Sequence, residues 1–435
     1  MVDRRTFLAA SAAVALACSD AAAQQLAVDG GSPVRTRPLA SKNWGPQFYD
    51  EQERHQLEDV LEGRLPFRWD NPPAKSKVAQ FENEYAARMQ TKYALAVTSG
   101  TAALHVAMAA LEVGRGDEVI LPAWTWYSCY NTIVQLGALP VFAEIDESFN
   151  IDPGDIEQRI TPQTKVIMAV HLQGNPADMD RILPIGRKHS IKLLEDASQS
   201  VGASHKGRPL GSMGDIGIYS LQQSKTITAG EGGAVVTSDP FLFERACRIH
   251  DVGGFRRCEA KLHFIPGLNY RMNDFIGGVL LAQVRKLDKI IGAVRGNAQR
   301  VYAGIADLPG LQLRRLPDPA GELGTGVFIE FKTKEARQRY ADAMKAENEP
   351  AMSPAGSVIL PVAPEIENKV TVSANWPSFI SARGKAIRYG RECCPRTIDI
   401  LSRFAGVMMS PKYTGEDTRD AVAAIRKVYP AVAKA

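Results

Sequence analysis

This chain of 435 residues has little of several features, and each absence excludes a class of protein to which it could belong. The six cysteines include no CxxC pair, and adjacent Cys393 and Cys394 would form only a strained bond, so neither a disulfide framework nor a metal site is expected. Basic residues (52) barely exceed acidic ones (48) and form no long block, so nucleic acid is not an expected partner. No internal repeat is visible, and the alanine-rich apolar run near the start is too short for a stable membrane span.

That alanine-rich start has the layout of a bacterial export signal. Arg4 and Arg5 precede an apolar run that ends in small residues at Ala23. This order predicts a twin-arginine signal peptide over residues 1–23 and an exported, periplasmic protein. The alternative is a tail without signalling function, which would leave the protein cytoplasmic. Lipid attachment at Cys18 is disfavoured because the usual leucine three residues earlier is absent.

Short apolar strands alternate with helical segments through the first two thirds of the chain. Helices are expected at 81–89 and 101–111, and strands at 94–98, 118–121, 140–145, 166–170 and 191–196. Buried strands separated by helices predict an α/β fold with a mostly parallel sheet between helices. In such sheets ligands bind at the carboxyl ends of the strands.

The pattern changes from about residue 289. A long helix is expected at 284–306, an alternating strand at 327–332, and further helices at 334–346 and 416–428. These elements predict a smaller C-terminal α+β domain. The expected organisation is a signal at 1–23, an N-terminal arm at 24–71, a large domain at 72–288 and a small domain at 289–435.

Lys225 follows the segment SLQQS and precedes the glycine-rich segment TITAGEGG. It lies among apolar and small residues, where burial keeps an amine poor in protons. Such an amine can form a Schiff base with an aldehyde cofactor such as pyridoxal 5'-phosphate (PLP) and later move a proton. For an isolated lysine a surface position is the simpler interpretation, but other residues accompany Lys225.

Asp196 ends an apolar strand twenty-nine residues before Lys225. A carboxylate there can pair with the protonated pyridine nitrogen of PLP, whereas Glu195 should point to the opposite face of the sheet. A helix cap is the alternative role for Asp196. The segment TSGTAAL at 98–104 turns a strand into a helix, whose free N–H groups suit a phosphate, although many helices begin this way.

Two further side chains extend this set. Ser220, five residues before Lys225, would add a hydroxyl to the same phosphate. Trp126, in PAWTW, can stack on a pyridine ring. The alternative interpretation is that Trp124 and Trp126 are both core tryptophans.

In this order, SGTAAL, PAWTW, EDASQSVGA, SLQQSK and GEGGAVVTSD resemble the motifs of the DegT-type sugar aminotransferases, over about residues 81–287. The resemblance implies a fold-type I PLP-dependent transferase with a seven-stranded sheet. It implies that Lys225 carries PLP, that Asp196 pairs with the pyridine nitrogen and that Gln199 lies near the phenolic oxygen. Trp126 matches the stacking aromatic.

The same match implies the phosphate site and a dimer. Thr101, Ala102 and Ser220 match the residues that bind the phosphate. The segment 268–272 matches one that crosses a dimer interface in the family, so Asn269 would reach the phosphate of the neighbouring subunit. A homodimer with shared active sites is therefore expected.

The expected reaction moves an amino group from glutamate or glutamine to a keto-sugar or keto-cyclitol. A PLP-dependent sugar dehydratase is the first alternative, and Lys225 argues against it because relatives with that chemistry have histidine there. An exported PLP-fold protein that binds without turnover is the second. The region 321–377, where substrate contacts often lie, matches the family poorly.

The substrate prediction depends mainly on Gln222, which stands where many sugar aminotransferases have histidine or tyrosine. Together with the segment CPRT at 394–397, this resembles the scyllo-inosose branch. An amide suits a ring with several hydroxyls, and Trp126 and Tyr127 could flank it. No arginine cluster suits a nucleotide diphosphate, so a free keto ring is predicted over a nucleotide-linked one. The alternative is that Gln222 only packs against the cofactor loop.

Overall fold

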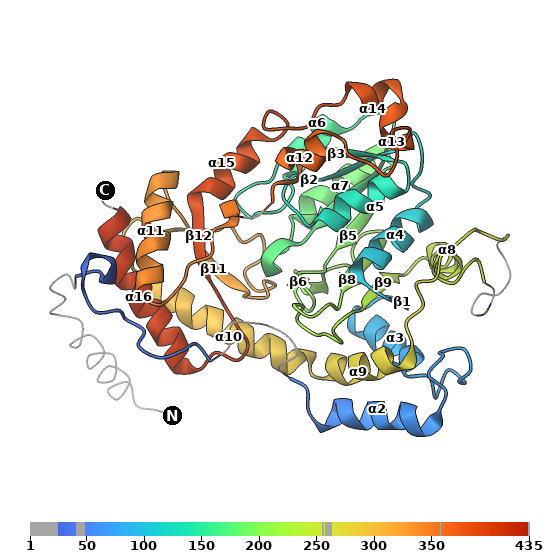
Figure 1. Cartoon of the computed structure of the whole chain (residues 1–435), viewed down its shortest axis with the longest axis horizontal. Helices are drawn as coiled ribbons and strands as arrows, with labels where there is room; N and C mark the ends of the chain where they lie inside the picture. Colours follow the sequence, from blue (N-terminus) through green and yellow to red (C-terminus); the bar gives the residue numbers. More distant parts are fainter. Residues whose placement is uncertain (1–24, 41–47, 255, 257–262, 357, 434–435) are drawn as a thin grey trace.

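The computed structural model describes residues 25–40, 48–254, 256, 263–356 and 358–433. The predicted signal at 1–23, with Cys18, lies outside these residues. Within them, no helix is long and apolar enough to cross a membrane. In Figure 1 the central sheet and the helices around it occupy the right-hand part of the molecule, and a smaller group of C-terminal elements occupies the left-hand part.

A seven-stranded sheet forms the centre of the molecule. Its order is β1 (Tyr93–Val97), β9 (Gly233–Thr237), β8 (Ile216–Ser220), β5 (Lys192–Asp196), β4 (Thr164–Val170), β2 (Glu118–Pro122) and β3 (Leu139–Ala143). Strand β9 runs antiparallel to both neighbours, while all other pairs are parallel. The predicted mostly parallel α/β sheet is therefore confirmed. Strands β8 and β9 were not among the five expected strands.

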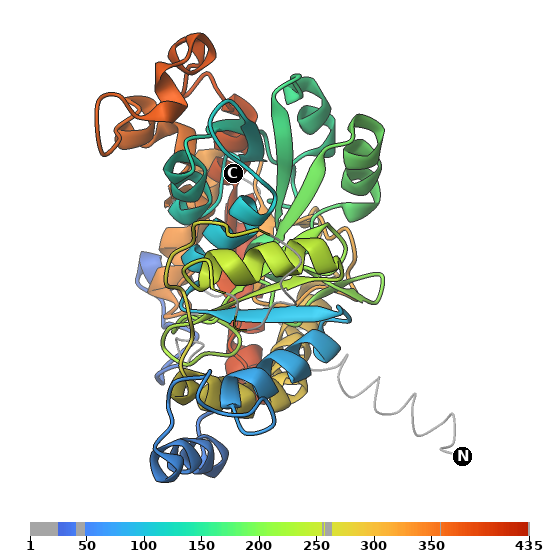
Figure 2. The same ribbon diagram turned by 90° about the vertical axis from the view of Figure 1, so that its right-hand side faces the viewer.

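Helices cover both faces of this sheet, which explains why the strands are apolar along their whole length. One face packs against α4 (Gly100–Ala110), α5 (Tyr127–Gln135) and α8 (Pro240–His250). The other packs against α3 (Lys77–Arg88), α6 (Pro153–Arg159), α7 (Met179–His189) and α9 (Asp274–Arg285). In Figure 2, β1 lies between α8 and α3.

A second, antiparallel sheet lies in the C-terminal part. It consists of β10 (Gln312–Leu313), β11 (Gly326–Glu330) and β12 (Phe404–Met408), beside α10 (Leu287–Ile305), α11 (Lys334–Ala346) and α16 (Gly415–Ala433). One hydrophobic core runs without interruption from the central sheet to β11. The expected domain boundary near residue 288 stays a prediction.

The long helix expected at 284–306 is confirmed as α10, although it begins three residues later, at Leu287. The preceding helix, α9, ends at Arg285, and the two helices meet at Lys286. The Lys286 ammonium is held by the Glu53 carboxylate at 2.6 Å, in the distant helix α2 (Glu51–Gly63). The apolar pattern runs through the break, so local sequence could not show it.

The remaining elements are short and connect the main ones. They are η2 (Ala27–Asp29), η3 (Leu172–Gly174), β6 (Ser204–His205), β7 (Arg208–Pro209), η4 (Pro354–Gly356), η5 (Leu360–Val362), α12 (Pro364–Glu367), α13 (Pro377–Ile380), α14 (Ala382–Ala386) and α15 (Pro395–Arg403).

Candidate active site

A cavity of about 600 Å³ opens at the carboxyl ends of the central strands. This is the edge at which ligands bind in open α/β sheets. The C-terminal part of the chain contributes Met408 of β12 and Thr325, just before β11. The other lining residues come from the ends of β4, β5 and β8 and the segments after them, from the start of α4, and from the start of α5 with the loop before it: Ser99, Gly100, Thr101, Leu104, Thr125, Trp126, Ser128, Cys129, Val170, Gln173, Asp196, Ser198, Gln199, Ser220, Gln222, Ser224, Lys225, Thr226 and Glu231.

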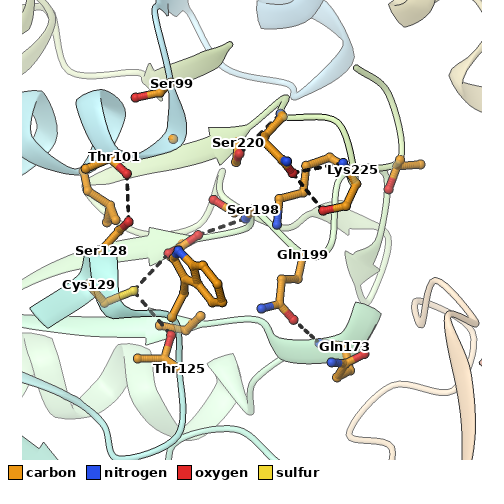
Figure 3. A pocket seen from close by; sticks show the side chains of 18 of the residues that line it. Ser99, Thr101, Thr125, Ser128, Cys129, Gln173, Ser198, Gln199, Ser220 and Lys225 are labelled. Carbon is orange, nitrogen blue, oxygen red and sulfur yellow. Dashed lines mark hydrogen bonds between the residues drawn. The ribbon is translucent and has the colours of Figure 1, made fainter. Parts of the chain in front are cut away.

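Lys225 lies on the loop that follows β8, and its side chain extends into the cavity (Figure 3). Its backbone N–H donates to the Gln222 carbonyl at 2.9 Å, which closes a tight turn. Burial lowers the pKa of the Lys225 ammonium, although the negative charge of Asp196 acts in the opposite direction. The amine is therefore more readily deprotonated, and more nucleophilic, than a surface lysine.

Asp196, the last residue of β5, is only 4% exposed and faces the same cavity. Its carboxylate accepts hydrogen bonds from the Ser198 backbone N–H at 2.9 Å and from the Cys129 thiol at 3.3 Å. Burial raises the pKa of Cys129, which keeps the thiol protonated and able to donate. These contacts hold the carboxylate in place and leave it accessible from the cavity.

Glu195 points to the opposite face of the sheet, as predicted. It is fully buried, and its carboxylate accepts hydrogen bonds from the Gly211, Met213 and Gly214 backbone N–H groups at 2.6–3.0 Å. The His171 Nε2 lies 2.9 Å away. Glu195 thus stabilises the loop before β8 and does not reach the cavity.

The start of α4 forms an anion cradle beside Ser220. Ser99 caps the helix by accepting the Ala102 N–H at 3.0 Å, which leaves that N–H occupied, and Ala102 does not line the cavity. The Gly100 and Thr101 N–H groups donate to no acceptor in the described part of the chain and are available for an anion. A Cβ at position 100 would lie 2.6 Å from the Ser220 Cβ, so only glycine permits this close approach.

The two tryptophans of PAWTW differ in their surroundings. Trp124 is 5% exposed and belongs to the core, whereas Trp126 is 68% exposed and lines the cavity. Trp126 therefore has a free face on which an aromatic ring can stack. Tyr127 does not line the cavity, and its phenol hydrogen-bonds Glu365 of α12.

The amides behave differently from one another. Gln199 accepts a hydrogen bond from the Gln173 backbone N–H at 3.1 Å and faces the cavity. Gln222 lines the cavity too. Its side-chain oxygen accepts hydrogen bonds from the Ser224 N–H and hydroxyl at 2.9 and 2.8 Å, so this oxygen is already bonded within the loop. Asn269 lies outside the cavity, and its side chain accepts the Arg271 N–H at 3.3 Å.

Sequence reasoning missed several residues of this cavity. Cys129 donates to Asp196, Ser128 hydrogen-bonds the Thr101 hydroxyl at 2.7 Å, and Gln173 follows the carboxyl end of β4. The position after a strand end was an available signal for Gln173. Thr325 and Met408 are distant in sequence and carried no signal.

The cavity suits PLP. It combines a lysine with a lowered pKa, a buried carboxylate, an exposed aromatic face and an anion cradle at a helix N-terminus. No group of three or more His, Cys, Asp or Glu side chains arranged to hold a metal ion occurs among the described residues.

Comparisons with known proteins agree with this arrangement. Residues 50–352 match the model of the DegT/DnrJ/EryC1/StrS aminotransferase family. GDP-perosamine synthase of Vibrio cholerae is 36% identical over 261 residues, which is 60% of this chain and 70% of that protein. A putative L-glutamine:3-amino-2,3-dideoxy-scyllo-inosose aminotransferase of Micromonospora echinospora is 37% identical over 299 residues, 66% of this chain and 68% of that protein.

The fold extends the match over almost the whole chain. The aminotransferase from Psychrobacter cryohalolentis superposes with a TM-score of 0.75 at 26% identity, covering 91% of this chain and 100% of that one. The chain therefore belongs to the DegT/DnrJ/EryC1/StrS aminotransferase family and is a PLP-dependent aminotransferase.

Proposed function

We propose that this cavity moves an amino group from glutamate or glutamine to the keto group of a sugar or cyclitol, with Lys225 as the cofactor-binding residue and proton carrier. The observation that carries the proposal is the convergence of Lys225 and Asp196 on one cavity that has an anion cradle at its end. Bound PLP supplies an electron sink for the carbanion that forms at the substrate carbon.

Each side chain has a distinct task in this proposal. The Asp196 carboxylate holds the proton on the pyridine nitrogen, and Trp126 covers one face of the ring. The Gly100 and Thr101 N–H groups and the Ser220 hydroxyl bind the phosphate. Lys225 would carry a proton between the substrate carbon and the reactive carbon of the cofactor. Its lowered pKa favours the free amine that this step requires.

The dehydratase alternative is not favoured, because Lys225 reaches the cavity, whereas relatives with dehydratase chemistry have histidine at this position. A non-catalytic binding protein would not need a buried amine beside a buried carboxylate.

The direct test supplies purified, PLP-loaded protein with glutamate or glutamine and measures the keto acid that forms. We expect keto acid together with a change in the visible spectrum. Protein that binds PLP but forms no keto acid from any amino acid would contradict the proposal.

We further propose that the acceptor is a free polyhydroxylated keto ring. The relatives differ on this point, since one is named for a GDP-linked sugar and the other for a scyllo-inosose derivative. Among the described residues that line the cavity, Lys225 is the only cation, and Glu231 adds a carboxylate. A nucleotide diphosphate would need several cationic partners, which the cavity of one chain does not supply.

The test of the acceptor compares kcat/KM for scyllo-inosose and for a nucleotide-linked 4-keto-sugar. We expect the free ring to be preferred. Replacing Gln222 by Glu, which keeps the shape but removes the amide donor, should reduce kcat/KM for the free ring by about tenfold, the value of one hydrogen bond. A preference for the nucleotide sugar would overturn this acceptor and leave the aminotransferase assignment intact.

We also propose a homodimer with shared sites. Phe264 and Leu268 are 61% and 53% exposed beside Asn269, and Val252 adds further apolar surface. Large exposed apolar side chains in one area favour burial against another protein surface. The Lys225→Ala and Asn269→Asp chains should each be inactive alone, and the mixed dimer should recover activity because one site inherits neither change. Proven mixing without recovery would contradict sharing.

Export is the last proposal, and it rests on the sequence at Arg4 and Arg5. Replacing both by lysine should hold the full-length protein inside the cell. The control is the wild-type chain in the same strain, assayed in periplasmic and cytoplasmic fractions. Wild-type protein found unprocessed and only in the cytoplasm would contradict export.

A further inference from the structure

Gln173 adopts a backbone conformation that is unusual for its residue type. It lies in η3, directly after β4, with φ of 53° and ψ of 41°, in the left-handed region. Gly174 follows with φ of 74°. A left-handed conformation is strained for a residue other than glycine, and such residues persist only where the surroundings hold them.

The segment before and at the start of β11 holds this turn. The Thr325 hydroxyl donates to the Gln173 carbonyl at 2.7 Å, and the Leu323 N–H donates to the Gly174 carbonyl at 2.8 Å. Arg314, itself 3% exposed, adds a second donor to the Gln173 carbonyl at 3.3 Å. A Cβ at position 174 would lie 2.9 Å from the Leu323 Cβ, so the two segments are in close contact. The C-terminal sheet thus fixes a turn of the central one.

The fixed turn determines how Gln199 is oriented. The Gln173 N–H points at the Gln199 side chain, 3.1 Å from its oxygen. A glutamine amide has an acceptor end and a donor end that can exchange by a half rotation. A backbone N–H can bond only the oxygen, so the Gln199 NH₂ must point away from Gln173, as Figure 3 shows. The cavity therefore receives a donor from Gln199.

We propose that Thr325, acting through the backbone of Gln173, is a positioning residue that keeps the Gln199 amide donor directed at the cofactor. The proposal rests on the proposed function, in which Gln199 lies near the phenolic oxygen of PLP. Thr325 is 7% exposed and lies within residues 50–352, which match the family model, so the expected poor match over 321–377 is wrong for residues 321–352. A remote element of the C-terminal sheet would thereby tune the electronic state of the cofactor.

A purely structural role for Thr325 predicts a different outcome. If its hydroxyl only joins the two sheets, its removal should lower stability and leave the bound cofactor unchanged. If it orients Gln199, the anionic phenolic oxygen loses a donor and becomes easier to protonate. The pH at which the visible absorption band of bound PLP changes should then rise.

The experiment titrates the visible spectrum of PLP-loaded wild type, Thr325→Val and Thr325→Ser. Valine keeps the shape and lacks the hydroxyl, whereas serine retains the hydroxyl. We expect the spectroscopic midpoint of Thr325→Val to rise by about half a pH unit or more, the order of one hydrogen bond, and that of Thr325→Ser to match wild type. Thr325→Ala gives the same comparison if the valine variant does not fold.

A double-mutant cycle completes the test. In a Gln199→Leu background, Thr325→Val should cause no further shift, because the donor it orients is already absent. Equal midpoints for fully loaded wild type, Thr325→Val and Thr325→Ala would overturn the positioning role, as would an undiminished shift in the Gln199→Leu background. Wild-type protein that acquires no visible band with PLP would instead refute the proposed function itself.

Discussion

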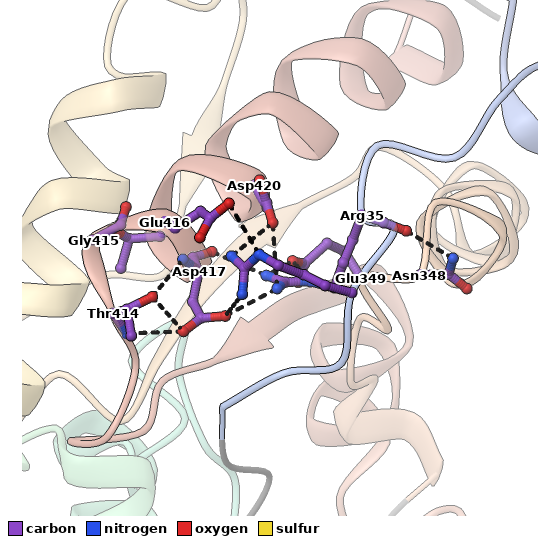
Figure 4. A network of polar contacts seen from close by, with 10 residues as sticks. Arg35, Asn348, Glu349, Thr414, Gly415, Glu416, Asp417 and Asp420 are labelled. Carbon is purple, nitrogen blue, oxygen red and sulfur yellow. Dashed lines mark hydrogen bonds and ion pairs between the residues drawn. The ribbon is translucent and has the colours of Figure 1, made fainter.

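In the cavity, Lys225 and Asp196 form no ion pair with any described residue, whereas Arg35 in the N-terminal arm is surrounded by carboxylates (Figure 4). Arg35 is 2% exposed, and its guanidinium contacts Glu349, Asp417 at 2.9 Å and Asp420 at 3.3 Å. Both regions bury ionisable groups. Only the arm supplies each buried charge with partners from its own chain.

The pKa values reflect this difference. Burial alone would raise the pKa of Asp417, but hydrogen bonds from Thr414, Arg37 and Arg35 lower it to about 2. Burial raises the pKa of Glu349 to about 7, although Arg35 opposes the rise. In the cavity, burial lowers the pKa of Lys225, because Asp196 compensates only in part.

The comparison separates two uses of buried charge. A buried ion pair offsets the cost of removing each charge from water, and breaking one side leaves an uncompensated charge. A buried group without a partner costs stability and is ready to react with a ligand. We therefore expect substitutions in the cavity to change activity more than stability, and substitutions in the arm to do the reverse.

The largest effect should come from Lys225→Ala. Amino transfer should fall by about 10³-fold or more, because the variant lacks the proton carrier. The midpoint of thermal unfolding, measured without PLP, should not fall, since no partner loses a contact. Keto-acid formation and thermal unfolding measure the two effects. A marked loss of stability with residual activity above a tenth of wild type would break the distinction between the regions.

Asp196→Asn should have the next largest effect on activity. The isosteric amide cannot hold a positive charge on the pyridine nitrogen, so the rate should fall about 10²-fold. Bound PLP should still give a visible band, because Lys225 and the anion cradle remain. Stopped-flow measurement of the first half-reaction gives the rate. A rate within threefold of wild type would remove Asp196 from this role.

In the arm, Arg35→Met should lower the free energy of unfolding by about 3–5 kcal/mol, because Asp417 and Glu349 lose a buried partner. Arg37→Met is the matched control. Arg37 lies at the more exposed edge of the same network, where solvent screens its charge, so its loss should cost much less than the loss of Arg35. Denaturant titration measures both. An equal loss of unfolding free energy in both variants would contradict the comparison. So would a folded Arg35→Met protein whose kcat falls as far as that of Lys225→Ala.

The smallest effect concerns pH. The pKa of Glu349 is raised from 4.5 to about 7 on folding, so its contribution to stability is full below pH 4.5 and is lost as the pH rises through 7. The pKa of Asp417 is lowered on folding, so the stability that Asp417 contributes is present above pH 3.8 and is lost as the pH falls through about 2. Wild type should therefore gain about 1–2 kcal/mol over Glu349→Gln between pH 8 and pH 5. Parallel stability curves for both proteins would refute this.

The sequence predicted the central sheet well because its strands are apolar throughout and bounded by turns. All five expected strands begin and end within two residues of the observed ones. The residues at strand ends, Asp196 among them, share a cavity as parallel topology requires. Strands β8 and β9 were not among the expected strands, and the antiparallel direction of β9 follows from its pairing with β1 and β8.

What the sequence could not show are contacts between distant segments. Lys286, between α9 and α10, pairs with Glu53, more than 230 residues earlier, and the Gln173 carbonyl accepts a hydrogen bond from the distant Thr325. In the sequence Arg35 has the pattern of an ordinary polar loop residue, yet it is buried and contacts Asp417 of α16. Such positions are set by tertiary packing, which local pattern does not encode.

The most direct test of the account is to locate the cofactor on the chain. Purified protein loaded with PLP is reduced with borohydride, digested, and analysed by mass spectrometry. We expect one modified peptide, with the reduced cofactor on Lys225, and its disappearance in Lys225→Ala. Modification of another lysine in the wild type, or an unchanged yield in Lys225→Ala, would contradict it.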